Sequence, residues 1–273
     1  QSMKRTSLGQ DSVVLVTGGN KGIGKETARE FCKLGCFVYI CGRDKTTLEA
    51  TKEEFLKDHY SIEALECDIR DYQSCSQLIA TVITQKGRLD VLVNNAGMSM
   101  RGSIEASSCN IIEEMMKVNY LGPVALTHYA IGPLKKSRGS IVFISSLTAL
   151  HGLPEVGPYG AAKLALKNLS ESLRAELYQD DVHVGILHVG FTDFDSGKVI
   201  YDNNGKLIPL KRAKNHQTRN EVARQVLVCV RRRKKEMTLT ALGKTASFLY
   251  RHFPRTSDAL VCKLSAKKFL VGN

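Results

Sequence analysis

The chain has 273 residues, of which 43% are hydrophobic and 24% are charged, and its formal net charge at pH 7 is +12. This composition is typical of a globular protein and excludes a disordered, collagen-like or disulfide-scaffold chain. No apolar run approaches the ~20 residues needed to span a bilayer, while Gln1-Ser2-Met3 resembles a tag remnant or an internal start and leaves open a removed N-terminal signal or anchor.

Strand-like and helix-like segments alternate along the chain. Apolar strands are predicted at residues 13–17, 37–41, 63–67, 89–93, 140–145, 184–188 and 236–240. Helices are predicted at 25–34, 46–58, 74–86, 111–134 and 159–178, and Pro123 should bend the helix over 111–134. Nearly continuous apolar strands separated by helices indicate a parallel sheet covered on both faces. We therefore expect a single doubly wound α/β domain over residues 12–240, with ligands at the carboxyl edge of the sheet.

The positive charge is concentrated near the C-terminus. Residues 206–273 contain 17 Lys and Arg against three acidic residues, so the remainder of the chain is close to neutral. Residues 241–273 are expected to form a basic helical extension, with a helix after Pro254 that is capped near Thr256 or Ser257. A nucleic-acid enzyme would spread positive charge along its cleft, so we expect no nucleic-acid partner. Peripheral contact with an anionic membrane is one interpretation; a solvated basic surface, and a helix packed over its own pocket or a partner subunit, are the alternatives.

Eight cysteines are present, but they include no Cys-x-x-Cys pair and no Cys/His cluster with metal-ligand spacing. We therefore expect free thiols, with neither a disulfide framework nor a metal site. Free thiols are typical of a reducing compartment, which favours the cytoplasm or a membrane surface that faces it.

A glycine-rich turn follows the first predicted strand and precedes a helix. This is the context that a Rossmann dinucleotide-binding fingerprint requires. Glycines allow a tight turn and a close approach of the backbone to a pyrophosphate, and the N-terminus of the helix then faces the phosphate charge. The turn reads Thr17-Gly18-Gly19-Asn20-Lys21-Gly22-Ile23-Gly24, and its predicted cofactor-binding residues are Gly18, Asn20, Lys21, Gly22, Ile23 and Gly24.

Five motifs occur in an order that resembles the short-chain dehydrogenase/reductase family over about residues 12–240. They are the Gly-x-x-x-Gly-x-Gly turn, Asn94-Asn95-Ala96-Gly97, Asn119 within Val-Asn-Tyr, Ser146 after Ile144-Ser145, and Tyr159-Gly160-Ala161-Ala162-Lys163. Within this family, the chain resembles NADP-preferring, hydroxysteroid dehydrogenase-like members with a basic C-terminal extension. The resemblance implies hydride transfer between a nicotinamide and a carbonyl or alcohol carbon.

The chemistry of such a reaction accounts for the residue types. Tyr159 and Lys163 are four residues apart and project from one helix face. A free tyrosine titrates near ~10, and a nearby ammonium lowers this pKa, so Tyr159 can exchange a proton with the substrate oxygen. Ser146 can hydrogen-bond the same oxygen. Ser145 competes for that role, but the family spacing favours Ser146, and neighbouring strand residues face opposite sides. By resemblance, Asn119 holds a water that connects Lys163 to solvent.

Charge near the second strand indicates the cofactor. NAD enzymes usually carry an acidic residue just after this strand, where the sequence has Arg43. Arg43 and Lys21 together suit a 2′-phosphate, which predicts NADP(H). Asp44 is a complication, because its charge can soften that preference.

The resemblance also implies further contacts to the cofactor. Asp68 and Ile69 match the pair that contacts adenine, although Asp68 can instead cap the following turn. After the sixth strand, Gly190 matches the family pattern, Val189 replaces a proline, and Phe194 replaces a threonine, which puts a hydroxyl contact to the phosphate in doubt. The other cofactor-binding residues implied are Asn95, Ala96, Gly97, Tyr159, Lys163, Val189, Gly190 and Thr192.

The substrate and assembly are less closely indicated. Residues 194–217 lie where the family carries a mobile substrate lid. Apolar residues that can line a pocket predict a hydrophobic substrate such as a steroid, retinoid or lipid; they are Leu147, Leu150, Leu153, Val156, Phe191 and Phe194, with Met98 and His151 nearby. Alternatives are a reductase of acyl or sugar carbonyls and an NADP(H)-binding sensor or scaffold with little turnover. Family resemblance implies a homodimer or homotetramer formed through the helices that contain Asn119 and Tyr159.

Overall fold

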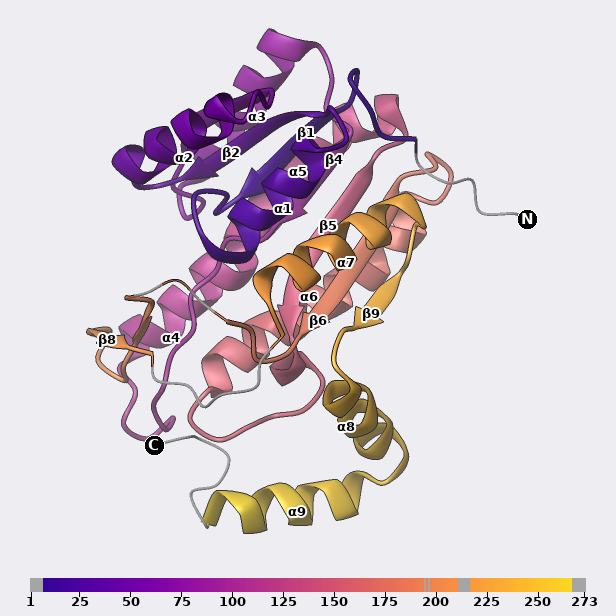
Figure 1. Ribbon diagram of the computed structural model, residues 1–273. Helices are drawn as coiled ribbons and strands as arrows, with labels where there is room; N and C mark the ends of the chain where they lie inside the picture. Colours follow the sequence, from indigo (N-terminus) through magenta and orange to yellow (C-terminus); the bar gives the residue numbers. More distant parts are fainter. Residues whose placement is uncertain (1–6, 194, 196, 211–216, 267–273) are drawn as a thin grey trace.

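Seven parallel strands form the centre of the computed structural model, which describes residues 7–193, 195, 197–210 and 217–266 (Figure 1). The strands lie in the order β3-β2-β1-β4-β5-β6-β9. Their bounds are β1 Val13–Thr17, β2 Phe37–Gly42, β3 Ile62–Glu66, β4 Val91–Asn94, β5 Ser140–Ser146, β6 His183–Val189 and β9 Glu236–Thr238. Each begins and ends within two residues of a predicted strand, because short apolar runs bounded by turns favour buried parallel strands.

The strand order reverses beside β1. This strand pairs with β2 on one side and with β4 on the other, so that Val14 lies opposite both Val38 and Val91. The chain therefore builds outward to β3 and then crosses back to β4. Such a reversal is the point at which doubly wound sheets bind ligands, beyond the carboxyl ends of the strands. The predicted doubly wound α/β fold is confirmed.

Helices cover both faces of the sheet. One face carries α1 (Gly22–Cys32), α2 (Lys45–Lys57) and α7 (Arg219–Arg231), and the other carries α3 (Tyr72–Lys86), α5 (Gly122–Ser137) and α6 (Gly157–Glu176). Because successive strand residues point to opposite faces, one strand supplies both cores. Val14 and Val16 of β1 face α1, while Leu15 faces α3 and α5.

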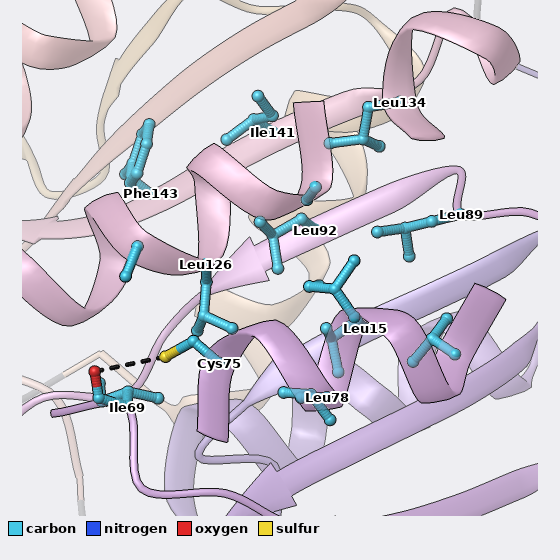
Figure 2. Packing of buried hydrophobic residues seen from close by; sticks show 14 of the residues in the cluster. Leu15, Ile69, Cys75, Leu78, Leu89, Leu92, Leu126, Leu134, Ile141 and Phe143 are labelled. Carbon is cyan, nitrogen blue, oxygen red and sulfur yellow. Dashed lines mark hydrogen bonds between the residues drawn. The ribbon is translucent and has the colours of Figure 1, made fainter. Parts of the chain in front are cut away.

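Figure 2 shows the core under α3 and α5. Leu92 and Phe143 from the strands meet Leu78 and Leu126 from the two helices, and all four are buried. Cys75 lies among them and donates its Sγ–H to the Ile69 carbonyl at 3.5 Å. This packing fixes the segment after β3 beneath α5, at the edge of the sheet where the predicted adenine contacts lie.

All eight cysteines are free thiols, as predicted. Six are buried, whereas Cys109 and Cys262 are exposed. Burial raises the pKa of Cys32 and of Cys229 to about 12, so neither is a thiolate near neutral pH.

The helix predicted over residues 111–134 is divided into three parts. Helix α4 spans Cys109–Met116, a π-helical segment η1 spans Lys117–Leu121, and α5 follows from Gly122. Pro123 has no N–H, and its ring crowds the carbonyl four residues earlier, which disfavours ordinary helical geometry here. The Gly122 N–H instead donates to the Lys117 carbonyl, a five-residue step. The interruption expected at Pro123 therefore takes the form of a π turn, and Asn119 lies within it.

The region after β6 contains elements that the pattern did not predict. Strands β7 (Val199–Tyr201) and β8 (Leu207–Pro209) pair as a two-stranded antiparallel hairpin, and α7 begins later, at Arg219. A signal for α7 was present in the sequence, because Thr218 and Glu221 form a capping box before an apolar periodic run. Phe194 lies outside the described residues.

Two C-terminal helices follow β9 at the carboxyl edge of the sheet. They are α8 (Ala241–His252) and α9 (Pro254–Ala266), and they lie together at one end of the molecule (Figure 1). The predicted cap near Thr256 or Ser257 is wrong: α9 begins at Pro254, whose fixed backbone angle suits the first helical position. No helix among the described residues is long and apolar enough to cross a membrane.

Candidate active site

The four predicted catalytic residues come from three neighbouring elements. Ser146 ends β5, Tyr159 and Lys163 lie in the first turns of α6, and Asn119 lies in the π segment η1. Helix α6 packs against β5, and η1 packs against α6. The topology therefore brings these residues to the edge that also holds the glycine-rich turn.

Lys163 is buried beneath Tyr159. Its side chain is 4% exposed, its Nζ donates to the Ile144 carbonyl at 3.0 Å, and Nζ lies 5.8 Å from the centre of the Tyr159 ring. Burial lowers the pKa of Lys163 to about 8. Since this pKa is above neutral, most Lys163 side chains still carry a proton at pH 7. The expected ammonium lies near the phenol ring.

The two neighbouring serines face different partners. Ser145 is buried and its hydroxyl donates to the Lys163 carbonyl at 3.3 Å. Ser146 is half-buried, and its Oγ accepts a hydrogen bond from the Thr148 N–H at 3.3 Å. An accepting hydroxyl keeps its own hydrogen to donate. Ser145 therefore links β5 to α6, whereas the Ser146 hydroxyl keeps a hydrogen that it can donate to another group.

Asn119 is fully buried and clamps the loop after β4. Its Nδ2 donates to the carbonyls of Met98 at 2.8 Å and Met115 at 3.1 Å, and its Oδ1 accepts from the Met98 N–H at 3.2 Å. A Cβ at Gly97 would lie 2.7 Å from Asn119 Oδ1 and 3.3 Å from Lys163 Nζ. Glycine at position 97 thus lets this loop approach both predicted catalytic side chains.

The glycine-rich turn is held in place by the loop after β4. Gly18 and Gly22 have φ of +62° and +56°, in the left-handed region that favours glycine. Thr17 Oγ1 accepts the N–H groups of Asn95 and Ala96, both at 2.9 Å, and Asn95 Nδ2 donates to the Thr17 carbonyl at 2.8 Å. Asn95 is therefore a clamp on the turn. A Cβ on Gly24 would overlap the Gly18 carbonyl, so close helix packing requires glycine there as well.

Charged groups near the end of β2 are arranged around the start of α2. The Asp44 carboxylate caps this helix by accepting from the Thr47 N–H at 3.2 Å. Asn20, from the glycine-rich turn, donates through Nδ2 to Thr47 Oγ1 at 2.7 Å. Arg43 and Lys21 are exposed. The acidic residue that complicated the cofactor prediction thus has a structural role.

Asp68 is engaged by its neighbour in the sequence. Its carboxylate accepts from the Arg70 backbone N–H at 3.0 Å and pairs with the Arg70 guanidinium, which also bonds Glu114 at 2.8 Å. These bonds to Arg70 lower the pKa of Asp68. The carboxylate caps the turn, as in the alternative interpretation, and its contact to adenine stays a prediction. Ile69 is buried, and its carbonyl would be 2.7 Å from a Cβ at Gly122.

The loop after β6 begins with the last three of the predicted cofactor-binding residues. Val189 is buried, a Cβ at Gly190 would lie 3.0 Å from Thr240 Cγ2, and Thr192 Oγ1 donates to the Gly190 carbonyl at 3.2 Å. Thr192 also pairs with Gln217 in an isolated bridge. The loop therefore returns to the edge of the sheet immediately before α7.

Most of the apolar residues that pack beside Tyr159 are not the ones predicted to line the substrate pocket. Tyr159 packs with Met98 and Tyr201 against buried residues of the loop after β4 and of α4, which are Met100, Ile111 and Met115. Of the predicted set, Leu147 packs against α8, where a Cβ at Gly243 would lie 2.6 Å from Leu147 Cδ2. The hairpin residue Tyr201 was missed because it is distant in the sequence from every motif.

Three charged residues were also missed. Asp195 Oδ2 accepts from the Gly22 N–H at 2.8 Å, so a carboxylate lies at the N-terminus of α1, and Asp195 forms an ion pair with Arg219. Arg101 is half-buried and donates through Nη1 to the Met100 carbonyl at 2.8 Å. Burial lowers the pKa of Arg101, while nearby Tyr159 and Glu155 favour its charged form. A carboxylate therefore lies at the start of α1, where the N-terminus of a helix attracts negative charge.

Comparison with known proteins identifies the family of the chain. Residues 12–204 match the family described as short chain dehydrogenase. Dehydrogenase/reductase SDR family member 7B of Xenopus laevis is 30% identical over 277 residues, covering 98% of this chain and 86% of that protein. The solved alcohol dehydrogenase of the archaeon Thermococcus sibiricus, complexed with 5-hydroxy-NADP, has a TM-score of 0.73 and 25% identity, covering 84% of this chain and 95% of that chain. A metagenomic short-chain oxidoreductase in complex with NADP has a TM-score of 0.69 and 25% identity, and the match covers 82% of this chain and 91% of that chain. With its fold, its glycine-rich turn and its Asn-Ser-Tyr-Lys arrangement, the chain belongs to the short-chain dehydrogenase/reductase family of oxidoreductases.

Proposed function

We propose that the protein is an NADP(H)-dependent oxidoreductase that interconverts a carbonyl and an alcohol on a small hydrophobic substrate. The observation that carries the proposal is the buried Lys163 ammonium, 5.8 Å from the centre of the Tyr159 ring, on a helix that packs against the strand ending at Ser146. The residues 12–240 that surround this edge form the catalytic unit, and residues 241–273 form an extension of it.

The chain's own residues would act on the substrate oxygen. When bound, the dinucleotide supplies or accepts the hydride. Ser146 donates a hydrogen bond to the oxygen and stabilises the charge that develops on it. Tyr159 gives that oxygen a proton during reduction and removes one during oxidation. Lys163 favours the phenolate by its charge, and Asn119 supports proton return by holding the loop that borders Lys163.

Two observations favour NADP(H) over NAD(H). Arg43 and Lys21 are exposed cations near the end of β2 and the glycine-rich turn, and Asp44 caps α2. Both solved relatives described above carry an NADP-type dinucleotide. A guanidinium binds a 2′-phosphate as a fork, whereas a carboxylate in that place would repel it.

Titration of the protein with NADPH and NADH tests the cofactor assignment. We expect the wild type to bind NADPH more tightly than NADH, measured by nucleotide fluorescence. Arg43→Ala should weaken NADPH binding about tenfold, equivalent to ~1.4 kcal/mol, and leave NADH nearly unchanged. Equal loss for both nucleotides, or a wild-type preference for NADH, would contradict the assignment.

The substrate class follows from the surroundings of Tyr159. Met98 and Tyr201 pack beside the phenol against buried methionine and isoleucine side chains. Methionines adapt their shape to apolar ligands. A steroid, retinoid or lipid-like carbonyl or alcohol is therefore the proposed substrate.

We also propose that the C-terminal helices contact an anionic, cytoplasm-facing membrane surface. Large apolar side chains on α8 and α9 are exposed, namely Leu242, Phe248, Phe253 and Leu260. Basic residues accompany them at Lys244, Arg251, Arg255 and Lys263. Exposed apolar side chains beside cations are typical of helices that lie on anionic lipid.

The helices are fastened to the active-site loop. The His151 ring stacks on Tyr250 with centroids 3.9 Å apart, and His151 Nε2 lies 3.3 Å from Asp258 Oδ1. Because His151 follows Ser146 by five residues, a membrane-bound α8 and α9 would place the catalytic edge close to the lipid. A hydrophobic substrate would then reach the site from the bilayer.

Assembly into a homo-oligomer through α5 and α6 is also proposed. Leu164 on α6 is 53% exposed although it is next to the buried Lys163. An exposed leucine on a helix that carries catalytic residues suits a contact with the same helix of a second copy.

A further inference from the structure

The backbone N–H at the start of α1 is bonded to a carboxylate from the chain itself. Asp195 Oδ2 accepts from the Gly22 N–H at 2.8 Å, although the two residues are separated by 173 positions in the sequence. A Cβ at Gly22 would find Asp195 Oδ2 as its nearest neighbour, at 3.9 Å. The carboxylate therefore occupies the place where, under the proposed function, a dinucleotide pyrophosphate would bind.

Arg219 holds this carboxylate from the other side. The guanidinium forms an ion pair with Asp195 Oδ1, and its Nε lies 3.3 Å from Asp193 Oδ1. The Arg219 backbone N–H donates to the same Asp193 oxygen at 2.8 Å. Since Arg219 is the first residue of α7, and α7 packs along α1, the arginine is positioned from a rigid element.

A carboxylate and a pyrophosphate cannot share this position. One N–H of Gly22 serves one anion at a time, and two anions this close repel each other. A guanidinium that pairs with a carboxylate here has the geometry to pair with a phosphate in the same place, because it binds both as a fork. Asp193 would keep Arg219 oriented while its partner changes.

We propose that Asp195 is an internal competitor of the cofactor, and that Arg219 exchanges the Asp195 carboxylate for the cofactor pyrophosphate. Binding of the dinucleotide then releases the Asp195 carboxylate from the Gly22 N–H and from Arg219. The exchange rests on the proposed dinucleotide binding and adds to it a competing carboxylate and a cofactor-binding arginine.

Binding measurements on purified variants test the exchange without any turnover. The Kd of NADPH is measured by calorimetry for the wild type, Asp195→Ala, Asp181→Asn and the double variant Asp195→Ala/Arg219→Ala. Asp181 is a matched control, because it forms an exposed pair with Arg233 at 2.8 Å at the opposite edge of the sheet. Thermal denaturation of each variant checks that it is folded.

Removing the competitor should tighten binding. We expect Asp195→Ala to lower the Kd of NADPH about three- to tenfold, while Asp181→Asn stays at the wild-type value. Adding Arg219→Ala to Asp195→Ala should then raise the Kd about tenfold, because the pyrophosphate loses its guanidinium. Inorganic pyrophosphate, which lacks the rest of the cofactor, should rank the variants in the same order.

Other results would overturn the exchange in distinguishable ways. If Asp195→Ala binds NADPH no more tightly than Asp181→Asn does, the carboxylate is not a competitor. If the double variant binds as tightly as Asp195→Ala, Arg219 is only a counter-ion of Asp195. If the wild type binds neither dinucleotide, the proposed function itself fails.

Discussion

Lys163 shows how one buried charge serves both the fold and the site. Its Nζ donates to the Ile144 carbonyl at 3.0 Å, and the residue is only 4% exposed. Because burial disfavours the charged form, it lowers the pKa of Lys163 to about 8. At neutral pH the buried ammonium therefore reduces the unfolding free energy. The position therefore suits the reaction better than it suits stability.

Stability should rise with pH because of this residue. The folded pKa is about 8 and the unfolded pKa is ~10.4, so the unfolded chain binds more protons between those values. The loss of unfolding free energy caused by the buried ammonium is fully present below pH 8. It disappears as the pH rises through the pKa that Lys163 has in the unfolded chain. We expect the difference in unfolding free energy between Lys163→Met and the wild type to shrink by about 2 kcal/mol from pH 7 to pH 9.5. Urea denaturation without added dinucleotide measures it; a difference independent of pH would contradict the burial argument.

Gly97 makes a second residue-scale prediction. Gly97→Ala would place a methyl group 2.7 Å from Asn119 Oδ1 and 3.3 Å from Lys163 Nζ. We expect a loss of roughly 1–3 kcal/mol in unfolding free energy together with reduced turnover, because both catalytic side chains must move. Gly132→Ala on α5 is the matched control, since nothing lies within 4 Å of its added methyl group. That change should be neutral or stabilise the helix by up to ~1 kcal/mol; equal behaviour of the two variants would refute the argument.

At the scale of elements, β5 and β6 are joined by a buried histidine. His183 begins β6 opposite Ser140, its Nδ1 lies 3.2 Å from Ser140 Oγ, and its Nε2 lies 2.9 Å from the Lys234 carbonyl. Because the carbonyl only accepts, Nε2 carries the proton in the neutral ring. Burial lowers the pKa of His183 to about 4. The strand pair that ends in Ser146 is thus built around a neutral imidazole.

Acid should weaken this strand pair. The unfolded histidine titrates near ~6.5, so as pH falls from there toward 4 the unfolded chain takes up a proton that folded His183 refuses. We expect the wild type to lose up to ~3 kcal/mol more unfolding free energy between pH 7 and pH 4 than His183→Gln does. Denaturant titrations of the two proteins at both pH values measure the difference. Identical acid sensitivity would mean that another group causes it.

The elements also show which features the sequence predicts and which it does not. The seven sheet strands and the spacing from Ser146 to Lys163 were predictable, because apolar runs and short motifs are local signals. The three-residue strands β7 and β8 are too short to show a period. The pairing of Asp195 with Gly22 depends on tertiary packing across 173 positions. For Asp68 the sequence left open an adenine contact or a cap on the following turn, because no pattern specifies the rotamer that bonds Arg70 in the structure.

At the scale of the whole molecule, α8 and α9 lie together at one end (Figure 1) and carry exposed apolar side chains, namely Leu242, Phe248, Phe253 and Leu260. The same end holds the loop after Ser146, through the stacking of His151 on Tyr250. The basic C-terminal part of the chain is therefore attached to the catalytic edge, and is not an independent tail. Substitution of the exposed apolar side chains of α8 and α9 should therefore abolish membrane docking without changing turnover.

Liposome flotation tests the docking. Phe248 and Phe253 are 57% and 53% exposed, so Phe248→Asp/Phe253→Asp removes apolar surface without opening the core. We expect wild-type protein to float with vesicles that contain phosphatidylserine and to be released by high salt. The double variant should stay at the bottom of the gradient, whereas Tyr178→Asp, at a distant exposed aromatic, should float like the wild type. Absence of wild-type binding, or equal binding of all three, would refute membrane docking.

The oligomer prediction concerns an exposed apolar residue that contacts a second copy of the chain and not a membrane. Leu164→Glu introduces a charge on α6 at a position that is 53% exposed in a single copy. We expect the wild type to be dimeric or tetrameric in light scattering, and the variant to dissociate, because two facing carboxylates repel at a symmetric contact. If the wild type and Leu164→Glu form oligomers of the same mass, the contact between copies does not involve this face of α6.

The central claim is that Tyr159 exchanges a proton with the substrate oxygen under the influence of Lys163. The most direct measurement compares NADPH consumption by the wild type and Tyr159→Phe across steroid, retinoid, acyl ketone and small aldehyde substrates, with NADPH affinity measured in parallel. The account predicts turnover of at least one hydrophobic carbonyl by the wild type, and a loss of about 10²–10⁴-fold in the variant, as expected for a general acid, with NADPH affinity nearly unchanged. Retention of wild-type turnover by Tyr159→Phe would contradict it.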